Sequence, residues 1–511
     1  MRELLIEKNR YFDSVFLLRI SRELEDLAGI EKAVVAMGTP ANLENLERVG
    51  FALDRSATRV LPTDLVIAVE AASEAALVAA RARLGELLAG SRQASEPAAG
   101  RPSTLTEAVS IDPKLNLALI SVPGAYAARE ARQALVRGLN VFLFSDNVPV
   151  EDEIALKDEA TRRGLLVMGP DCGTAILNGT PIGFANVVRR GPIGIVGASG
   201  TGIQEVSSLI DRLGGGVSQA IGTGGRDLSE PVAARSTLAA MDALTDDADT
   251  GLIVLVSKSP SPAVAERVLA RLRKTRKPAV VQFVAAPPRR PERTIAFART
   301  LDEAARQACR LAGLDVPDRT VLPDAPAPPP VEAAGVVRGF FCGGTLCQEA
   351  WAVLYDAGLE VRSNVAADEA LRATAGDPVA GHVLWDLGDD ALTVGRPHPM
   401  IEPALRDRYV AEAGGDTAVS VILADCVIGY GAHPDPAAGL ATAASTALHT
   451  ARRAERRLVV IASVTGTDRD PQGYGRQQRT LQEAGVVVAE SNAAAARCAA
   501  ELLRGAEGRT K

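Results

Sequence analysis

The sequence is poor in aromatic residues, cysteine and histidine, and it has no long apolar run. Phe, Trp and Tyr make up 4% of the 511 residues, which include six cysteines and four histidines. The longest apolar stretches, at 251–257 and 458–463, have the length of a strand and fall far short of the ~20 residues of a membrane span. Residues 1–10 are rich in charge and have no apolar core, so no secretory signal is expected. The scattered cysteines predict reduced thiols in a cytoplasmic protein.

Neither sign of charge dominates. The chain has 56 Lys and Arg against 63 Asp and Glu, a net charge of −7, and 47% of its residues are hydrophobic. A chain this apolar folds rather than staying disordered. The balanced charge excludes a broad surface for nucleic acid or anionic membranes, although a local basic pocket is compatible with it. We therefore expect neither nucleic acid nor a membrane as a partner.

Two shifts in composition divide the chain. Residues 91–103 are polar and rich in Ala, Pro and Gly, which is typical of a linker. Residues 316–334 contain so many prolines that neither a helix nor a central strand can continue through them. The predicted pieces are 1–90, 104–190, 191–315, the Pro-rich linker 316–334, and 335–505.

The first piece is predicted to be a small α/β domain. The pattern indicates a β-like run at 14–20, a helix at 21–28 and a strand at 33–37. A helix near 43–49, a strand at 65–69 and an Ala-rich helix at 74–88 follow. The two middle pieces alternate strands with helices of 10–15 residues, which predicts doubly wound parallel sheets. In such sheets ligands bind at the carboxyl ends of the strands.

Two glycine-rich loops follow successive predicted strands of this middle region. In each, glycines allow close backbone approach, and the helix start that follows offers free N–H groups to an anion. The alternative is tight packing with a Ser or Thr helix cap. NAD(P) is disfavoured, because no acidic residue ends the next strand. The predicted phosphate-binding residues are Ser199, Gly200, Thr201, Gly202, Gly222, Gly224 and Gly225.

These residues resemble the alpha subunit of succinyl-CoA synthetase and its acyl-CoA synthetase relatives. The motifs are Val122-Pro123-Gly124, Gly169-Pro170-Asp171-Cys172 where the family has GPNC, Gly194–Thr201, and Gly222–Gly225 where it has GIGG. The resemblance implies a Rossmann-like CoA-binding domain at 104–190 and a flavodoxin-like ligase domain at 191–315. It also implies that a CoA site contains Pro123, Gly124, Asp171 and Cys172. The alternative is that this site is vestigial and no longer binds CoA.

The last piece resembles the carboxy-terminal ligase domain of the beta subunit of the same enzyme. The full chain, with MGTPANLENL in its leading domain and the segments from Asp386 to Pro436, resembles the FdrA family. Some members of that family are implicated in anaerobic allantoin breakdown as a subunit of oxamate carbamoyltransferase. That resemblance implies companion subunits and a role in purine catabolism. It adds Gly343, Gly344 and Thr345 to the predicted phosphate-binding residues.

Two parts of a succinyl-CoA synthetase are missing. No ATP-grasp domain precedes 335–505, and the stretch aligned with the phosphohistidine loop, 285–299, contains no histidine. Lys258 stands where the family has the acid that supports that histidine, and a lysine binds a phosphoryl group as a cation. A solvated charge is the alternative for Lys258. We therefore expect no phosphohistidine relay.

A polar cluster is predicted at the sheet edge of the last piece. Carboxylates and histidines there could hold Mg²⁺ or another divalent metal, or serve as acid and base; turn chemistry is the alternative. Its catalytic candidates, taken with Lys258, are Asp386, His398 and His433. The remaining members are Asp389, Asp390, Arg396, Asp425 and Asp435.

Carbamoyl transfer fits what remains, because carbamoyl phosphate is already activated and needs only positioning and electrostatic stabilisation. We predict a subunit of a carbamoyltransferase that binds carbamoyl phosphate or another small phosphorylated acid. An acyl-CoA synthetase and a non-catalytic scaffold that binds CoA or a nucleotide are the alternatives.

Overall fold

The computed structural model describes residues 1–316 and 335–507, with gaps at 11, 13, 26, 49, 52–58, 95–101, 375–379 and 394–396. The predicted linker at 316–334 lies outside the described residues except for Val316. The chain forms two compact units, one of residues 1–108 with 393–397 and one of 109–392 with 398–511. No helix of the described part is both long and apolar enough to cross a membrane.

The first unit contains an antiparallel sheet of order β1-β3-β2. The predicted β-like run at 14–20 is wrong: it is the first half of a helix, because Leu17, Ile20 and Leu24 recur at helical spacing and are all buried in the core. The first strand was not predicted, and the last helix runs into the predicted linker. The elements are β1 (Arg2–Glu7), α1 (Ser14–Glu25), β2 (Ile30–Met37), α2 (Pro40–Arg48), β3 (Leu65–Ala71) and α3 (Glu74–Ala94).

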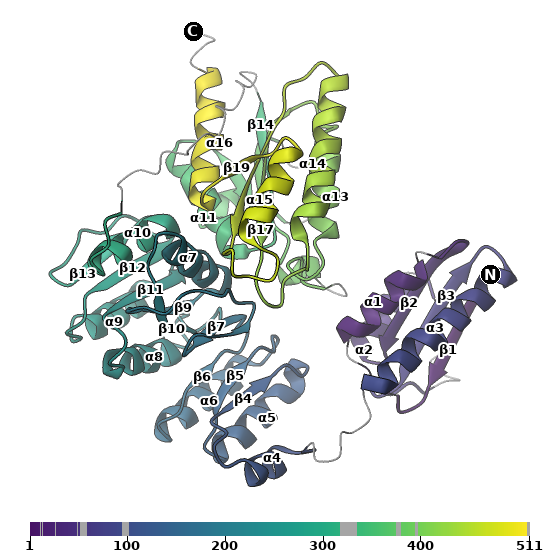
Figure 1. The fold of residues 1–511 in the computed structure, drawn as a ribbon, viewed down its shortest axis with the longest axis horizontal. Helices are drawn as coiled ribbons and strands as arrows, with labels where there is room; N and C mark the ends of the chain where they lie inside the picture. The colour runs from purple at the N-terminus through teal and green to yellow at the C-terminus, as the bar shows by residue number, and fades with distance from the viewer. Residues whose placement is uncertain are drawn as a thin grey trace. The chain divides into compact units, whose positions relative to one another are not determined.

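The second unit begins with a small parallel sheet of order β4-β5-β6 (Figure 1). Each strand is followed by a helix or a loop at its carboxyl end, as the alternating pattern predicts. The elements are α4 (Leu105–Ile111), β4 (Leu117–Ile120), α5 (Gly124–Val136), β5 (Asn140–Leu143), α6 (Val150–Arg162) and β6 (Val167–Met168).

A seven-stranded sheet of order β13-β12-β11-β9-β10-β7-β8 follows. Its first five strands in that order are parallel, whereas β7 and β8 form an antiparallel hairpin at the edge, turned by Asn178 and Gly179 with positive φ. Asn-Gly is the strongest short hairpin signal, yet this hairpin was not predicted. The elements are β7 (Thr174–Leu177), β8 (Thr180–Gly183), β9 (Ile193–Ala198), α7 (Gly200–Arg212), β10 (Val217–Gly222), α8 (Arg235–Asp246), β11 (Leu252–Lys258), α9 (Pro262–Leu272), β12 (Ala279–Val284), β13 (Ile295–Ala298) and α10 (Leu301–Leu311).

The third sheet of this unit has six parallel strands in the order β15-β16-β14-β17-β18-β19. Its elements are β14 (Val336–Phe341), α11 (Gly344–Asp356), β15 (Val361–Ser363), a 3-10 turn (Glu369–Leu371), β16 (His382–Asp386), α12 (Asp390–Thr393), α13 (Ala404–Ala413), β17 (Val419–Val427), α14 (Pro436–Arg453), β18 (Val459–Thr465), α15 (Tyr474–Glu483), β19 (Val487–Ala489) and α16 (Asn492–Glu507).

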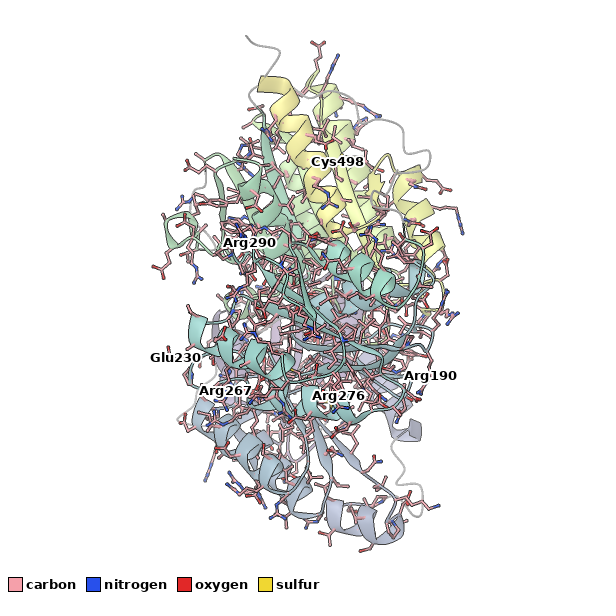
Figure 2. All side chains as sticks on the ribbon, turned by 90° about the vertical axis from the view of Figure 1, so that its left-hand side faces the viewer. Arg190, Glu230, Arg267, Arg276, Arg290 and Cys498 are labelled. Atoms are coloured by element: carbon pink, nitrogen blue, oxygen red, sulfur yellow. The ribbon has the colours of Figure 1, made fainter. Side chains whose placement is uncertain are left out.

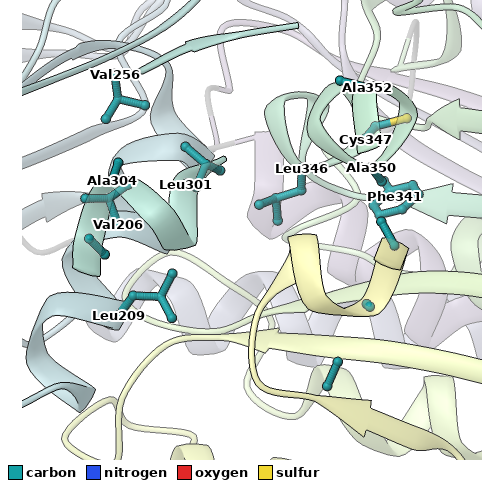
Figure 3. Packing of buried hydrophobic residues seen from close by; sticks show 14 of the residues in the cluster. Val206, Leu209, Val256, Leu301, Ala304, Phe341, Leu346, Cys347, Ala350 and Ala352 are labelled. Carbon is teal, nitrogen blue, oxygen red and sulfur yellow. The ribbon is translucent and has the colours of Figure 1, made fainter. Parts of the chain in front are cut away.

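The seven-stranded and six-stranded sheets share one core. Helices α7 and α10 cover one face of the first sheet and α11 and α16 one face of the second, and their apolar side chains form a single buried cluster (Figures 1 and 3). Helices α8 and α9, and α13 to α15, cover the opposite faces. This is the predicted α/β architecture of doubly wound, succinyl-CoA synthetase-like sheets. It places the two sheets' ligand edges within one unit.

Candidate functional site

Each of the two doubly wound sheets has a point at which the order of its strands reverses. Strand β9 lies between β10 and β11, and β14 lies between β16 and β17, so the chain winds away in both directions from β9 and from β14. Ligands of such sheets bind in the crevice at this reversal, beyond the carboxyl ends of the strands. Ser199 follows β9, Lys258 ends β11, Thr345 follows β14 and Asp386 ends β16. Four predicted site residues therefore belong to these two edges.

Helices α7 and α11 begin against each other. The Oγ of Ser199 and the Oγ1 of Thr345 are 2.7 Å apart, and both residues are buried. Ser199 also caps α7, since its Oγ accepts a hydrogen bond of 3.0 Å from the N–H of Gly202. A Cβ on Gly343 would lie 2.9 Å from the methyl carbon of Thr201, so this glycine lets the two helix starts approach closely. The structure thus joins the predicted residues 199–202 and 343–345 in one place.

This pair of helix starts has the chemistry of an anion site. The first N–H groups of each helix have no acceptor within the helix, and both dipoles present their positive ends here. The hydroxyls of Ser199 and Thr345 carry two protons, of which their mutual hydrogen bond uses one. The other is left for an acceptor. A phosphate between α7 and α11 would meet donors from both.

Asp425 holds the loop before α11 in place. Its two carboxylate oxygens accept hydrogen bonds of 2.7 and 2.8 Å from the N–H groups of Cys342 and Gly343. The buried Arg406 donates to the carbonyl oxygen of Asp425 at 2.8 Å and to that of Pro436 at 2.9 Å. Asp425 therefore positions the helix start and is not free to act as an acid or base.

Asp386 lies directly beside the first residue of α11. A Cβ on Gly344 would be 2.4 Å from its Oδ2, and its Oδ1 accepts a hydrogen bond of 2.9 Å from the N–H of Gly388. Burial raises the pKa of Asp386 to about 7, against the opposing effect of the Lys258 ammonium. The carboxyl is thus placed to gain or lose a proton near neutral pH at the edge of the anion site.

His398 borders the same glycine. A Cβ on Gly388 would lie 2.7 Å from its Nε2 and 3.2 Å from the Oδ1 of Asp386. The Nδ1 of His398 accepts a hydrogen bond of 3.2 Å from the N–H of Met400, so the neutral ring carries its proton on Nε2. Burial lowers the pKa of His398 to about 4. The imidazole is therefore a neutral hydrogen-bond donor near Asp386.

His433 has a local role. Its Nδ1 accepts a hydrogen bond of 3.1 Å from the N–H of Asp435, and the side chain of Asp435 in turn accepts from Gln477 at 2.9 Å. This is the turn chemistry that the sequence left as the alternative. Arg396 of the predicted cluster lies outside the described residues. Among the described residues, no group of three or more His, Cys, Asp or Glu side chains is placed to hold a metal ion.

The second glycine loop is packed. A Cβ on Gly222 would lie 2.3 Å from the carbonyl oxygen of Thr174, one on Gly224 would lie 2.2 Å from that of Pro170, and one on Gly225 would lie 2.9 Å from the Oδ2 of Asp171. These short distances indicate that the glycines allow tight backbone packing, which was the alternative to phosphate binding. We leave Gly222, Gly224 and Gly225 out of the proposed site.

Helix α8, which follows this loop, already has an anion at its start. The Asp227 carboxylate accepts from the N–H groups of Ser236 and Thr237 at 3.0 and 2.8 Å. This cap explains why α8 begins at Arg235 and not at 231 as predicted. Buried Lys157 bridges Asp227 and Glu153, each at 2.7 Å. Arg226 is 3.1 Å from Glu153 and donates to the carbonyl oxygen of Val148.

The predicted CoA residues lie at the carboxyl ends of β4 and β6. Pro123 and Gly124 begin α5, and a Cβ on Gly124 would lie 2.2 Å from the carbonyl oxygen of Asp146. Asp171 has a positive φ, and Cys172 is fully buried. Burial raises the pKa of the Cys172 thiol to about 12, so the thiol is not a nucleophile at neutral pH. The role of all four in CoA binding stays a prediction.

Two buried glutamates that join the sheets were not predicted from the sequence. Glu205 on α7 accepts from the N–H of Asn492, the first residue of α16, at 3.1 Å. Glu349 on α11 accepts from the N–H of Leu301, the first residue of α10, at 2.6 Å. The two contacts are equivalent, because Gly200-Thr201…Gln204-Glu205 and Gly344-Thr345…Gln348-Glu349 repeat one pattern. That repeat was the signal available in the sequence.

Anion affinity should depend on the protonation of Asp386. Ionisation of this carboxyl beside α11 opposes the binding of an anion there. Sulfate, whose charge is constant above pH 5, should therefore bind about tenfold more weakly at pH 8.5 than at pH 5.5, which corresponds to a shift of about one unit in the pKa of Asp386 when sulfate binds. Asp386→Asn should remove most of this dependence. Calorimetric titration of both proteins with sulfate across this range measures it, and an unchanged pH profile in the variant would contradict the placement.

Comparisons with known proteins relate the chain to CoA-binding and CoA-ligase domains. Family profiles match residues 1–103 (AllF, heavy metal-associated domain), 188–284 (CoA binding domain) and 340–502 (CoA-ligase). The protein YahF of Escherichia coli (strain K12) is 43% identical over 498 residues, 96% of each chain. The alpha subunit of an ADP-forming succinate–CoA ligase of Methanothermobacter thermautotrophicus is 27% identical over 42% of this chain and 74% of its own length. An acetyl-coenzyme A synthetase of Ca. Korarchaeum cryptofilum, a solved structure, has 13% identity and a TM-score of 0.32 over 77% of this chain and 84% of that one.

The CoA-binding profile falls on 188–284, the part predicted to be the flavodoxin-like ligase domain, so the division between 104–190 and 191–315 stays a prediction. The heavy metal-associated profile covers residues 1–103, which contain neither cysteine nor histidine. Thiolate and imidazole are the ligands that soft metal ions prefer, and this part of the chain offers none. By its identity to YahF over nearly the full length of both chains, and by its succinyl-CoA synthetase-like domains, the chain belongs to an AllF/FdrA-like family.

Proposed function

We propose that this chain is a subunit of a carbamoyl-transferring enzyme that binds carbamoyl phosphate where α7 and α11 begin. The observation that carries the proposal is the meeting of these two helix starts at Ser199 and Thr345, whose hydroxyl oxygens are 2.7 Å apart. Two converging helix dipoles and their free N–H groups favour a phosphate group. The chain keeps the parts that hold an acyl phosphate, and its sequence offers no phosphohistidine loop to make one.

Carbamoyl transfer needs no covalent relay. A nitrogen of the acceptor attacks the carbonyl carbon of carbamoyl phosphate, the carbon–oxygen bond to phosphate breaks, and phosphate leaves with that electron pair. The acceptor nitrogen loses a proton, for which ionised Asp386 is the proposed base. The Nε2–H of His398 and the Lys258 ammonium are the proposed donors to the developing negative charge, and the helix starts stabilise the leaving phosphate. His433 has no part in this scheme.

The FdrA resemblance supplies the acceptor and the partners of the proposal. It points to the reaction of carbamoyl phosphate with oxamate to give oxalurate and phosphate, in allantoin and purine breakdown. It also points to companion subunits that complete the site. Co-expression of this chain with the proteins encoded beside it should give phosphate-dependent conversion of oxalurate to oxamate and carbamoyl phosphate. An assembly that makes acyl-CoA from CoA, ATP and a carboxylate, and transfers no carbamoyl group, would overturn the proposal.

The second candidate is an acyl-CoA synthetase, favoured by the profile matches at 188–284 and 340–502. In that case CoA is expected at the start of α5, at Pro123 and Gly124, with Asp171 and Cys172 nearby. CoA would supply the thiol that accepts the acyl group. Binding of CoA, measured by calorimetry and lost in Gly124→Ala but kept in Gly85→Ala, separates this candidate from carbamoyl transfer. Gly85 is a suitable control because it lies in helix α3 and a Cβ there meets no neighbour within 4 Å.

No phosphoenzyme should form from ATP. The four histidines are at 382, 398, 433 and 449, and none lies in 285–299, where the relay histidine aligns. Incubation of the chain with γ-labelled ATP, followed by electrophoresis at alkaline pH, should therefore give no labelled band. A stoichiometric acid-labile label would contradict the mechanism.

A further inference from the structure

A cavity of about 210 Å³ lies at the carboxyl ends of β12 and β13, apart from the residues of the proposed anion site. The two strand ends, Phe283 and Phe297–Arg299, form one side, and the loop at 286–289 forms the other. No part of the proposed function uses it. A concave hollow lined by apolar side chains and a few charged ones is the kind of place where small molecules bind.

Apolar side chains form one part of the cavity wall, and polar groups form the rest. Two phenyl rings, Phe283 and Phe297, and two proline rings, Pro287 and Pro288, line the cavity. Prolines limit the motion of the loop that closes it. These groups fit a flat or aliphatic body and make no hydrogen bonds to it. Specificity must therefore come from the charged side chains at the cavity.

Three charged side chains line the cavity, and two of them are already engaged. Arg299 donates to the Asp356 carboxylate at 2.8 and 2.7 Å and to the carbonyl oxygen of Ala286. Glu303 accepts from the backbone N–H of Arg299 at 2.7 Å and from Gln307 at 2.9 Å. Both oxygens of that carboxylate are thus occupied.

Arg289 is the charge left for a ligand. The acidic residue nearest to it in the sequence, Glu292, accepts hydrogen bonds from Arg273 at 2.7 and 3.0 Å, and Arg273, with a smaller contribution from Arg289, lowers the pKa of Glu292. Arg289 is exposed at the mouth, and its guanidinium has the fork geometry that binds a carboxylate through two parallel hydrogen bonds. The neighbouring Arg290, labelled in Figure 2, is also exposed but does not line the cavity.

We infer that this cavity binds a small organic acid, with its apolar body between Phe283, Phe297 and the two prolines and its carboxylate on Arg289. The volume is below the roughly 300–1,000 Å³ of sites for drug-sized ligands, so a nucleotide or CoA does not fit. The inference does not rest on carbamoyl transfer. It concerns a separate site that would hold an acid beside the strand edge that Lys258 ends.

Benzoate is the probe, with benzamide as its uncharged match. Calorimetric titration of the full chain should show saturable binding of one benzoate and none of benzamide at the same concentration. Arg289→Gln should weaken benzoate binding at least tenfold, whereas Arg290→Gln should change it less than twofold. Both arginines are exposed, so thermal unfolding should be unchanged in either variant.

Three results would overturn the inference. They are no saturable benzoate binding, equal weakening by Arg289→Gln and Arg290→Gln, and loss of benzoate binding in a Ser199→Gly/Thr345→Val variant. The second would indicate general attraction to a basic loop. The third would place the probe between α7 and α11 instead. Retained benzoate binding in a chain that fails to transfer carbamoyl groups leaves this site standing without the proposed function.

Discussion

Replacement of Lys157 by methionine should lower the free energy of unfolding by about 3–5 kcal/mol, the usual cost of breaking a buried ion pair on one side. The Lys157 ammonium is 2.7 Å from both Glu153 and Asp227 and 3.1 Å from the carbonyl oxygen of Thr223. All three charged side chains are essentially inaccessible to water. Methionine fills the same space, but it leaves the buried Asp227 carboxylate without a cation and Glu153 with Arg226 alone, 3.1 Å away. The loss is electrostatic and not a loss of packing.

Arg162→Met is the matched control, because Arg162 lies on the same helix and pairs with Glu159 at the surface. Exposed pairs contribute about 0–1 kcal/mol, so this variant should unfold almost as the native chain does. Urea unfolding followed by far-UV circular dichroism compares the three proteins. A Lys157→Met protein as stable as the control would mean that the network is not buried as described.

The strand–helix alternation predicted the class of fold because it is a local property of the sequence. Strands such as β9 and β11 are short apolar runs, and each helix that follows has one apolar face. The same local reasoning failed for α1, where Ser14–Ile20 contains enough β-branched and aromatic residues to suggest a strand. Leu24, one turn beyond that run, completes the helical stripe. A window ending at residue 20 could not include it.

The predicted site residues at the two helix starts lie close together in the fold, and their role in binding stays a prediction. Ser199 and Thr345 are far apart in the sequence, and only the tertiary fold brings their hydroxyls together. Glycine loops look alike in sequence whether they hold a phosphate or a neighbouring backbone. The contacts of Gly224 with Pro170 separate the two cases and depend on a different part of the chain. His433 was predicted as a catalytic candidate because histidine is a common acid or base. Its hydrogen bond to the N–H of Asp435 is instead the turn chemistry that the sequence offered as the alternative.

The repeat of Gly-Thr and Gln-Glu in α7 and α11 shows how the site is built. Each glutamate caps the last helix of the other sheet, so the two sheets meet through a pair of equivalent contacts. This arrangement fixes α7 against α11 and keeps their first turns together. The helix starts differ in the residue before each: Ser199 caps α7, whereas Gly343 precedes α11 without a side-chain cap.

That difference supplies a precise variant for the last prediction, in which loss of the paired hydroxyls weakens phosphate binding. Ser199→Gly places at α7 the residue that α11 already has, and glycine is tolerated at a helix cap. Thr345→Val keeps the shape of its side chain. Only one hydroxyl proton of the pair is left for a ligand. Loss of that charge-assisted hydrogen bond should cost about 1.5–3 kcal/mol, so the double variant should bind inorganic phosphate about ten- to a hundredfold more weakly.

Calorimetry with phosphate, with circular dichroism as the check on folding, decides the question. Ser208→Ala is the matched control, because its buried hydroxyl lies further along α7 and has no hydrogen-bond partner among the described residues. The control should bind phosphate as the native chain does. If the folded double variant also does so, the hydroxyls serve only to cap and pack the helices. If binding is weakened in the double variant and not in the control, phosphate binds where α7 and α11 begin. The two substitutions remove only the hydroxyls of Ser199 and Thr345 and leave the backbone N–H donors of both helix starts in place.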